Sequence, residues 1–139
     1  MLLDTSGLLA LLHRAEAEHK QAVSRYKGAP VRLTHSYVLL EFVALANARR
    51  LPRLAALTFV SDLLGNPDIE MVWVDKTLHL EAMDLLFARL DKTYSLCDAV
   101  SFVLMRQRGI FTALTTDHHF DQEGFQRLLM TEDKRTHSG

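Results

Sequence analysis

The sequence has few of the features on which several large classes of protein depend. Its single cysteine, Cys97, excludes an intrachain disulfide and a cysteine-rich zinc site, and we expect a reducing, cytoplasmic location. Its 16 basic and 17 acidic side chains give a formal net charge of -1, so no strong overall field attracts nucleic acid or a membrane. This balance does not exclude nucleic acid, because acids gathered in one site would offset basic patches elsewhere.

Long apolar runs and signature loops are also absent. No uncharged run approaches the length of a membrane-spanning helix, so we expect no membrane contact. Asp4 interrupts the first apolar stretch and no basic segment precedes it, which argues against a signal peptide. No G-x-G-x-x-G follows a strand, which disfavours a dinucleotide-binding domain. The 139 residues, 48% of them hydrophobic and without repeats or linkers, suffice for one domain with its own core.

Short apolar segments alternate with longer helical segments along the chain. We predict strands at 1–3, 31–34, 69–74 and 110–114, with 125–130 as a further candidate. The predicted helices cover 8–14, 16–27, a segment around Glu41 that ends near 49–51, 53–64, 76–90 and 95–108. This alternation predicts an α/β domain with a mainly parallel sheet. We expect the polar residues 131–139 to form a frayed tail.

Two acids stand in almost wholly apolar helical segments. Glu41 has largely apolar neighbours at helical spacing, such as Tyr37 and Leu45, so we expect it to be buried. A buried carboxylate needs a partner, which would be a cation from elsewhere in the chain, a shared proton or a metal ion. Asp98 lies in a second apolar helix, where it also fits an S-x-x-D capping box that begins at Ser95. A capping role and a functional role for Asp98 are compatible.

Two more acids each follow a predicted strand. Asp4 comes directly after the first apolar segment, and Asp117 follows 112–116. Functional groups gather at the carboxyl ends of the strands in a parallel sheet. Each acid also has an ordinary interpretation, Asp4 as a helix N-cap and Asp117 as a turn or cap residue before His118. Taken alone, neither residue identifies a site.

Together the four acids make a stronger case, because helices packed on a parallel sheet can bring all of them to one edge. Converging carboxylates raise each other's pKa if they stay unpaired. A hard divalent cation such as Mg²⁺ or Mn²⁺ removes that conflict, since it takes oxygen ligands. A metal held in this way lowers the pKa of a bound water and neutralises charge on a phosphate. The pattern therefore predicts hydrolysis of phosphodiester bonds.

The segments around these acids also give the chain a family resemblance. They read MLLDTS at 1–6, LLEF at 39–42, LCDA at 96–99 and LTTDHHF at 114–120, followed by EGF at 123–125. With these motifs in this order over nearly the whole chain, the sequence resembles the PIN-domain ribonucleases, in particular the VapC-like toxins of bacterial and archaeal toxin–antitoxin pairs. Each motif alone is short, and the ordered set of four carries the resemblance.

The resemblance implies a fold, an activity and a set of catalytic residues. The fold is a Rossmann-like three-layer α/β/α sandwich, with the nuclease domain over 1–130. The activity is Mg²⁺- or Mn²⁺-dependent cleavage of single-stranded or loop RNA by a metal-activated water. Asp4, Glu41, Asp98 and Asp117 match the family's acidic quartet. We expect the three aspartates to hold one metal, and Glu41 to bind a second metal or orient the attacking water.

The resemblance and the sequence also suggest residues that would support the metal site or contact RNA. Thr5 or Ser6 matches a hydroxyl that the family places beside the metal, and Thr116 lies near it. Candidates for contact with RNA are Arg49, Arg50 and His118, although a solvated helix end and an ordinary loop histidine are the commoner explanations. We interpret His119 as a loop histidine too, because no His-x-x-x-His or cysteine pattern supports a zinc site.

The resemblance also implies partners: RNA, a second copy of the chain in a homodimer, and a cognate antitoxin on a separate chain. The antitoxin would block the acidic site by inserting a basic side chain. Two other functions stay open. One is a PIN ribonuclease in RNA processing without a toxin role. The other is a non-enzymatic α/β interaction module, whose four acids would be caps and ion pairs. A receiver-type domain is a weaker alternative, because Glu41 and Asp98 lie on apolar helices rather than at strand ends.

Overall fold

A five-stranded parallel sheet organises the protein, whose computed structural model describes residues 1–130. The expected tail at 131–139 lies outside the described residues. The strand order is β3-β2-β1-β4-β5 and every pairing is parallel. The strands are β1 (Leu2–Leu3), β2 (Leu33–His35), β3 (Glu70–Val72), β4 (Thr112–Leu114) and β5 (Gln126–Arg127). The predicted mainly parallel sheet is thus confirmed.

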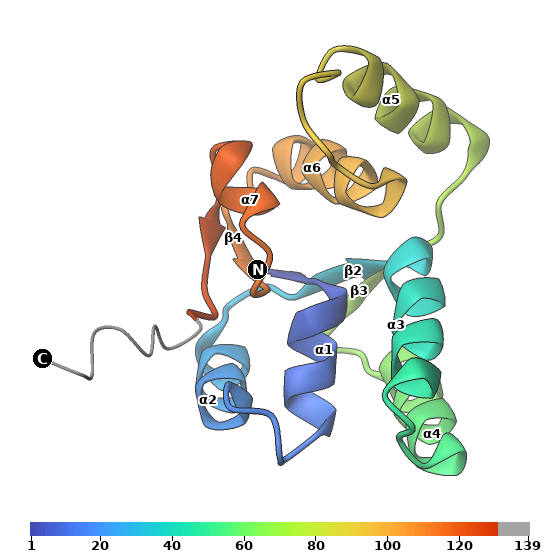
Figure 1. The fold of residues 1–139 in the computed structure, drawn as a ribbon, viewed down its shortest axis with the longest axis vertical. Coiled ribbons are helices and arrows are strands. Elements are labelled where there is room, and N and C mark those ends of the chain that lie inside the picture. The colour runs from blue at the N-terminus through green and yellow to red at the C-terminus, as the bar shows by residue number, and fades with distance from the viewer. Residues whose placement is uncertain (131–139) are drawn as a thin grey trace, which may run out of the picture.

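Residues 1–130 also form seven helices, which cover both faces of the sheet (Figure 1). They are α1 (Thr5–Leu12), α2 (His19–Gly28), α3 (Ser36–Ala48), α4 (Arg53–Gly65), α5 (Lys76–Phe87), α6 (Leu96–Arg108) and α7 (His119–Gln122). Helices α1 to α4 pack on one face and α5 to α7 on the other. The short helix α7 was not predicted. No helix in the described part of the chain is long and apolar enough to cross a membrane.

Alternation along the strands divides the apolar residues between two cores. Leu3 and Leu114 belong to the core beneath α1 to α4, whereas their neighbours Leu2 and Ala113 belong to the core beneath α5 to α7. This is the consequence of successive side chains pointing to opposite faces of a strand. All four residues are fully buried. The predicted three-layer α/β/α sandwich is therefore confirmed.

The local signals that end and begin helices are largely confirmed. Ser95 and Asp98 form the predicted capping box, in which each side chain accepts a hydrogen bond from the other residue's backbone N–H. Gly109 ends α6 at a φ of 65°, a left-handed conformation that glycine adopts without strain. The N-cap interpretation of Asp4 is wrong. Asp4 occupies that position before α1, but its side chain makes no capping hydrogen bond because it is turned towards β4.

The strand order reverses at the centre of the sheet. From β1 the chain builds β2 and β3 to one side, and then crosses back to add β4 and β5 on the other side. Ligands of open parallel sheets bind outside the carboxyl ends of the strands at such a switch point. Here that point lies between the ends of β1 and β4, which Asp4 and Thr115 directly follow.

Candidate metal centre

A cleft of about 340 Å³ lies at this switch point, and all four predicted acids line it. They come from the end of β1, from α3, from the first turn of α6 and from the loop after β4. The complete lining is Asp4, Thr5, Ser6, Glu41, Leu45, Thr93, Ser95, Asp98, Thr116, Asp117 and His119. Residues that are far apart in the sequence thus meet at one edge of the parallel sheet, which is where such a fold can bring them.

Asp4 is the most deeply buried of the acids, with 5% of its surface exposed. Its Oδ2 accepts a hydrogen bond of 2.8 Å from the Thr115 hydroxyl. Burial raises the pKa of Asp4 to about 7; the hydrogen bond from Thr115 opposes this rise, and the nearby charges of Asp98 and Asp117 add to it. A positive charge beside Asp4 would therefore stabilise its ionised form.

The backbone orients the next two acids. Asp98 is buried, and its Oδ2 accepts a 3.0 Å hydrogen bond from the Ser95 N–H of the capping box. Burial raises the pKa of Asp98, and the charge of Asp117 adds to that rise. Asp117 is half-buried, and its Oδ1 accepts a 2.9 Å hydrogen bond from the backbone N–H of His119. The predicted capping and turn roles therefore coexist with a place in the cleft.

Glu41 is exposed, so the prediction that it is buried was wrong. Its apolar neighbours on α3, such as Val38 and Phe42, are buried in the core. The Glu41 side chain instead lines the cleft. The carboxylate accepts a 3.2 Å hydrogen bond from the Thr5 hydroxyl. This contact joins the start of α1 to α3, and Glu41 needs no ion-pair partner because it is in contact with water.

The other predicted hydroxyl groups brace the cleft. The Ser6 hydroxyl accepts a 3.0 Å hydrogen bond from the Thr116 backbone N–H. It also lies 3.1 Å from the hydroxyl of Thr115, which bonds Asp4. Sequence reasoning missed Thr115, although it directly follows β4 and precedes Asp117 by two residues. Ser6 and Thr115 link the segment after β1 to the segment after β4.

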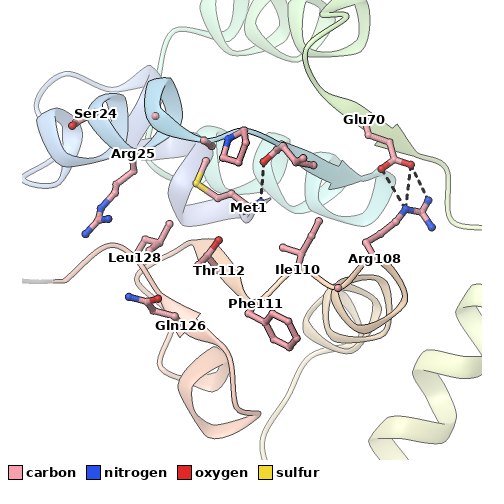
Figure 2. Close-up of a pocket in the computed structure, with 15 residues that line it drawn as sticks. Met1, Ser24, Arg25, Glu70, Arg108, Ile110, Phe111, Thr112, Gln126 and Leu128 are labelled. Carbon is pink, nitrogen blue, oxygen red and sulfur yellow. Dashed lines mark hydrogen bonds and ion pairs between the residues drawn. The ribbon is translucent and has the colours of Figure 1, made fainter.

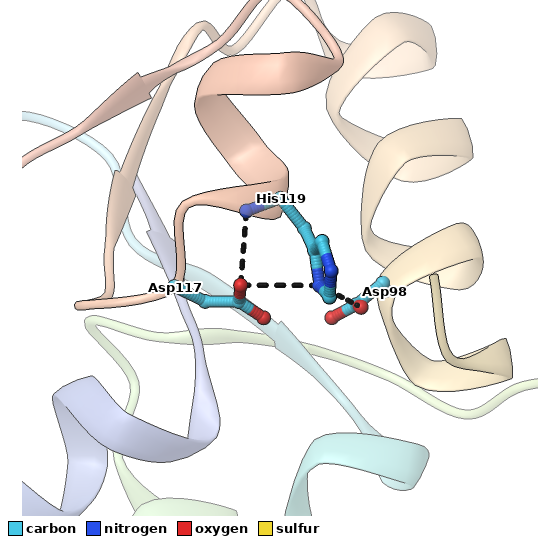
Figure 3. Close-up of side chains that lie close together, drawn as sticks. All are labelled: Asp98, Asp117 and His119. Carbon is cyan, nitrogen blue, oxygen red and sulfur yellow. Dashed lines mark hydrogen bonds and ion pairs between the residues drawn. The ribbon is translucent and has the colours of Figure 1, made fainter. Parts of the chain in front are cut away.

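His119 is the other residue whose place sequence reasoning missed. It is the first residue of α7, and its ring lies between Asp98 and Asp117 (Figure 3). Its Nδ1 is 3.2 Å from Asp98 Oδ2 and 3.1 Å from Asp117 Oδ1. A signal was present in the sequence, because His119 follows Asp117 by only two residues just past a strand.

The three candidates for RNA contact do not line the cleft. Arg49, just past α3, forms an exposed ion pair of 3.0 Å with Glu16. Arg50 is exposed and has a positive φ of 57°. The side chain of His118 is 65% exposed and lies beside the cleft, with its Nδ1 3.8 Å from Asp117 Oδ1. Only His118 is therefore close to the acids.

The donor set fits a divalent cation. Ligand atoms of Asp98, Asp117 and His119 all lie within 4.8 Å of one another, and Asp4 is close enough for its pKa to respond to both aspartates. Burial raises the pKa of Cys97, which precedes Asp98 in the chain, and the same negative charges, those of Glu41, Asp4 and Asp98, raise it further. Oxygen-rich donors with surplus negative charge suit Mg²⁺ or Mn²⁺.

Comparison with known proteins agrees with this geometry. Residues 1–125 match the PIN domain. The chain belongs to the PIN domain family. This PIN domain is 32% identical over 126 residues to the 23S rRNA-specific endonuclease VapC20 from two strains of Mycobacterium tuberculosis, CDC 1551 / Oshkosh and ATCC 25618 / H37Rv. The match covers 90% of this chain and 95% of each relative.

A solved structure extends the similarity to three dimensions. The crystal structure of Mycobacterium tuberculosis VapC20, a toxin that cleaves the sarcin-ricin loop, superposes on this PIN domain with a TM-score of 0.82. The two chains are 30% identical, and the match covers 92% of this chain and 98% of the other. The predicted PIN fold and the resemblance to VapC-like toxins are therefore confirmed.

A larger cavity of this PIN domain lies elsewhere. It measures about 740 Å³ and opens at the amino ends of the strands, near Met1 and Ile110 (Figure 2). Its one acid, Glu70, is already paired with Arg108 at 2.8 Å. The smaller cleft, and not this larger cavity, thus holds the groups that fit a metal.

Proposed function

We propose that this chain is a divalent-metal-dependent endoribonuclease that acts as the toxin of a VapBC-type toxin–antitoxin pair. The observation that carries the proposal is the meeting of four carboxylates from separate elements at the switch point of a PIN domain. The similarity to VapC20, a 23S rRNA-specific endonuclease, supports RNA as the substrate. Because RNA is the substrate, we place the enzyme in the cytoplasm.

The acids would divide the work of the site. Asp4, Asp98 and Asp117 would hold one Mg²⁺ or Mn²⁺, directly or through water. When bound, such a cation lowers the pKa of water and neutralises charge on the phosphate. Glu41 would bind a second cation or orient the attacking water, and its exposure leaves it open to solvent and substrate. Thr115 holds the carboxylate of Asp4 in place through its hydrogen bond.

Exposed basic side chains would contact the RNA backbone. His118 is the best placed, since it is exposed and adjacent to Asp117. Arg49 and Arg50 would contact more distant phosphates. Arg49 would first have to leave Glu16, which costs little because an exposed ion pair contributes only about 0–1 kcal/mol.

The proposal includes two protein partners. One is an antitoxin on a separate chain that inserts a basic side chain among the acids. That side chain would neutralise the carboxylates in place of the metal and exclude the RNA. The other partner is a second copy of this chain in a homodimer. Light scattering of the purified protein, with and without the antitoxin, tests both assemblies.

The decisive experiment compares the wild-type protein with Asp4→Asn on defined RNAs. The first substrate is an RNA hairpin with the sarcin-ricin sequence, beside a scrambled hairpin, each with Mg²⁺, Mn²⁺ or EDTA. The amide of the variant keeps an oxygen that accepts from Thr115 and removes a costly buried charge, so the variant should fold. We expect metal-dependent cutting by the wild-type protein only. Cutting by Asp4→Asn at the wild-type rate would contradict the assignment of this residue.

Two further results would contradict the proposal, the first as a whole and the second in part. The first is no cutting of any RNA together with no metal-induced rise in melting temperature, which would favour a non-enzymatic module. The second concerns the toxin role alone. If induced expression of an active enzyme does not slow growth, a role in RNA processing is favoured. We expect growth arrest with the wild-type chain and none with Asp4→Asn.

A further inference from the structure

The imidazole of His119 has one ring nitrogen close to two of the acids but bonded to neither. Its Nδ1 is buried and has no hydrogen-bond partner among residues 1–130, although two carboxylate oxygens lie close by. The distances are 3.2 Å to Asp98 and 3.1 Å to Asp117 (Figure 3). The angles at the ring do not suit a hydrogen bond to either oxygen. Ligand atoms of Asp98, Asp117 and His119 all lie within 4.8 Å of one another.

These separations match those of ligands around one ion. In an octahedral site whose ligands lie about 2.1 Å from the ion, neighbouring ligand atoms are about 3.0 Å apart. We propose that Nδ1 of His119 is a ligand of the same divalent cation as Asp98 and Asp117, and that it biases the centre towards transition-metal ions over Mg²⁺. This inference deepens the proposed function and rests on it. A nitrogen ligand favours first-row transition ions, whereas Mg²⁺ prefers oxygen.

The surroundings of the ring prepare it for this role. Nε2 lies 3.0 Å from the Thr93 hydroxyl. With Nε2 donating its proton to that hydroxyl, the lone pair of Nδ1 would be free for a cation. The ring packs edge-on against Tyr94, with 5.4 Å between centroids. Tyr94 is held in turn by a 3.2 Å hydrogen bond from its hydroxyl to the buried Glu123. The contacts with Thr93 and Tyr94 therefore hold the ring beside the acids.

Mn²⁺ is the probe that tests the inference. Pulsed EPR of Mn²⁺ bound to the wild-type protein should show coupling to a directly bonded ¹⁴N nucleus. The coupling should vanish in His119→Phe, which keeps an aromatic ring against Tyr94 but has no nitrogen. It should persist in His118→Phe, the matched control for the neighbouring exposed imidazole. A coupling that survives in His119→Phe would overturn the inference.

Metal titration supplies a second readout. In His119→Phe the affinity for Mn²⁺ should fall about tenfold or more, and the affinity for Mg²⁺ should fall less. The opposite result would mean that His119 is a cationic partner of the two acids. Both ions would then bind more tightly to the variant, and the inference would be wrong.

The inference and the proposed function can fail separately. Metal-dependent RNA cleavage without any ¹⁴N coupling would overturn the role of His119 and leave the nuclease intact. No binding of Mn²⁺ or Mg²⁺ to the wild-type protein, with no cleavage, would overturn both.

Discussion

The hydroxyl of Thr115 donates a 2.8 Å hydrogen bond to the carboxylate of Asp4, which lies 111 residues away in the sequence. Thr115 is fully buried and Asp4 nearly so. The same hydroxyl accepts a 3.0 Å hydrogen bond from the backbone N–H of Asp117. One threonine thus connects two of the proposed metal ligands across the switch point of the sheet.

Removing this hydroxyl should weaken metal binding. In Thr115→Val the bond that lowers the pKa of Asp4 is lost, so that pKa should rise above about 7 and protons should compete with the metal. We expect about a tenfold loss of Mn²⁺ affinity at pH 7, and a smaller loss at about pH 8.5. Thr115→Ser keeps the hydroxyl and serves as the control. Equal affinities for all three proteins at pH 7 would contradict the prediction.

A close approach between α1 and β4 depends on Gly7. A Cβ at this position would lie 2.0 Å from the backbone oxygen of Leu114, which no real contact allows. We expect Gly7→Ala to destabilise the protein by about 3 kcal/mol and to move the segment that carries Asp4. Chemical denaturation measures the loss. Gly65→Ala is the control, since a Cβ at Gly65 meets nothing within 4 Å and should change stability by at most about 1 kcal/mol.

Glu123 is the buried carboxylate of an ionic cluster, in which it binds two partly exposed arginines and is linked to His119 through Tyr94. Its carboxylate pairs with Arg89 at 2.9 Å and with Arg106, and it accepts from the Tyr94 hydroxyl. Burial raises the pKa of Glu123, but the hydrogen bonds and charges of the two arginines outweigh burial and lower that pKa below its ordinary value.

Replacing Arg106 with methionine should therefore leave a buried carboxylate with one cation fewer. We expect a loss of about 2 kcal/mol in unfolding free energy, below the range for a fully buried pair because Arg106 is partly exposed. Asp91→Asn, which removes an exposed pair with Lys92, should cost less than about 1 kcal/mol. Equal effects of the two substitutions in urea denaturation would show that the cluster contributes nothing beyond a surface pair.

The stability of the protein should fall in acid because of His35. Burial lowers the pKa of His35 to about 3, and its Nε2 lies 2.8 Å from the Ser101 hydroxyl. The unfolded chain, with a pKa of about 6.5, binds the proton more readily than the folded chain. The contribution of neutral His35 is therefore complete above about pH 6.5 and is lost as the pH falls towards 3.

Urea denaturation between about pH 7 and pH 4.5 measures this effect. The stability of the wild-type protein should fall by up to about 1.4 kcal/mol per pH unit more steeply than that of His35→Gln. His118→Gln, which changes an exposed ring, should follow the wild-type curve. Parallel curves for wild-type and His35→Gln would contradict the assignment.

Much of the fold could be predicted because the relevant interactions are local. Ser95 and Asp98 are three residues apart and satisfy each other's backbone at the start of α6, whatever the rest of the chain does. Gly109 ends the same helix through its own conformational freedom. Alternating apolar segments fixed the class of fold, since strands buried on both faces need helices to cover them. The short helix α7 escaped prediction, because four residues carry no periodic pattern.

The sequence by itself determined the four acids, their order along the chain, and the α/β class of fold that can bring them to one edge of a sheet. Only the tertiary structure decided what surrounds each one. Helical periodicity placed Glu41 among apolar residues but could not show that the Glu41 side chain lines a cleft. Periodicity also could not predict that the Asp4 side chain bonds Thr115 instead of capping its helix, or that the His119 ring lies between two aspartates. Periodicity records which residues share a face, whereas the environment of a side chain depends on what another segment brings against it.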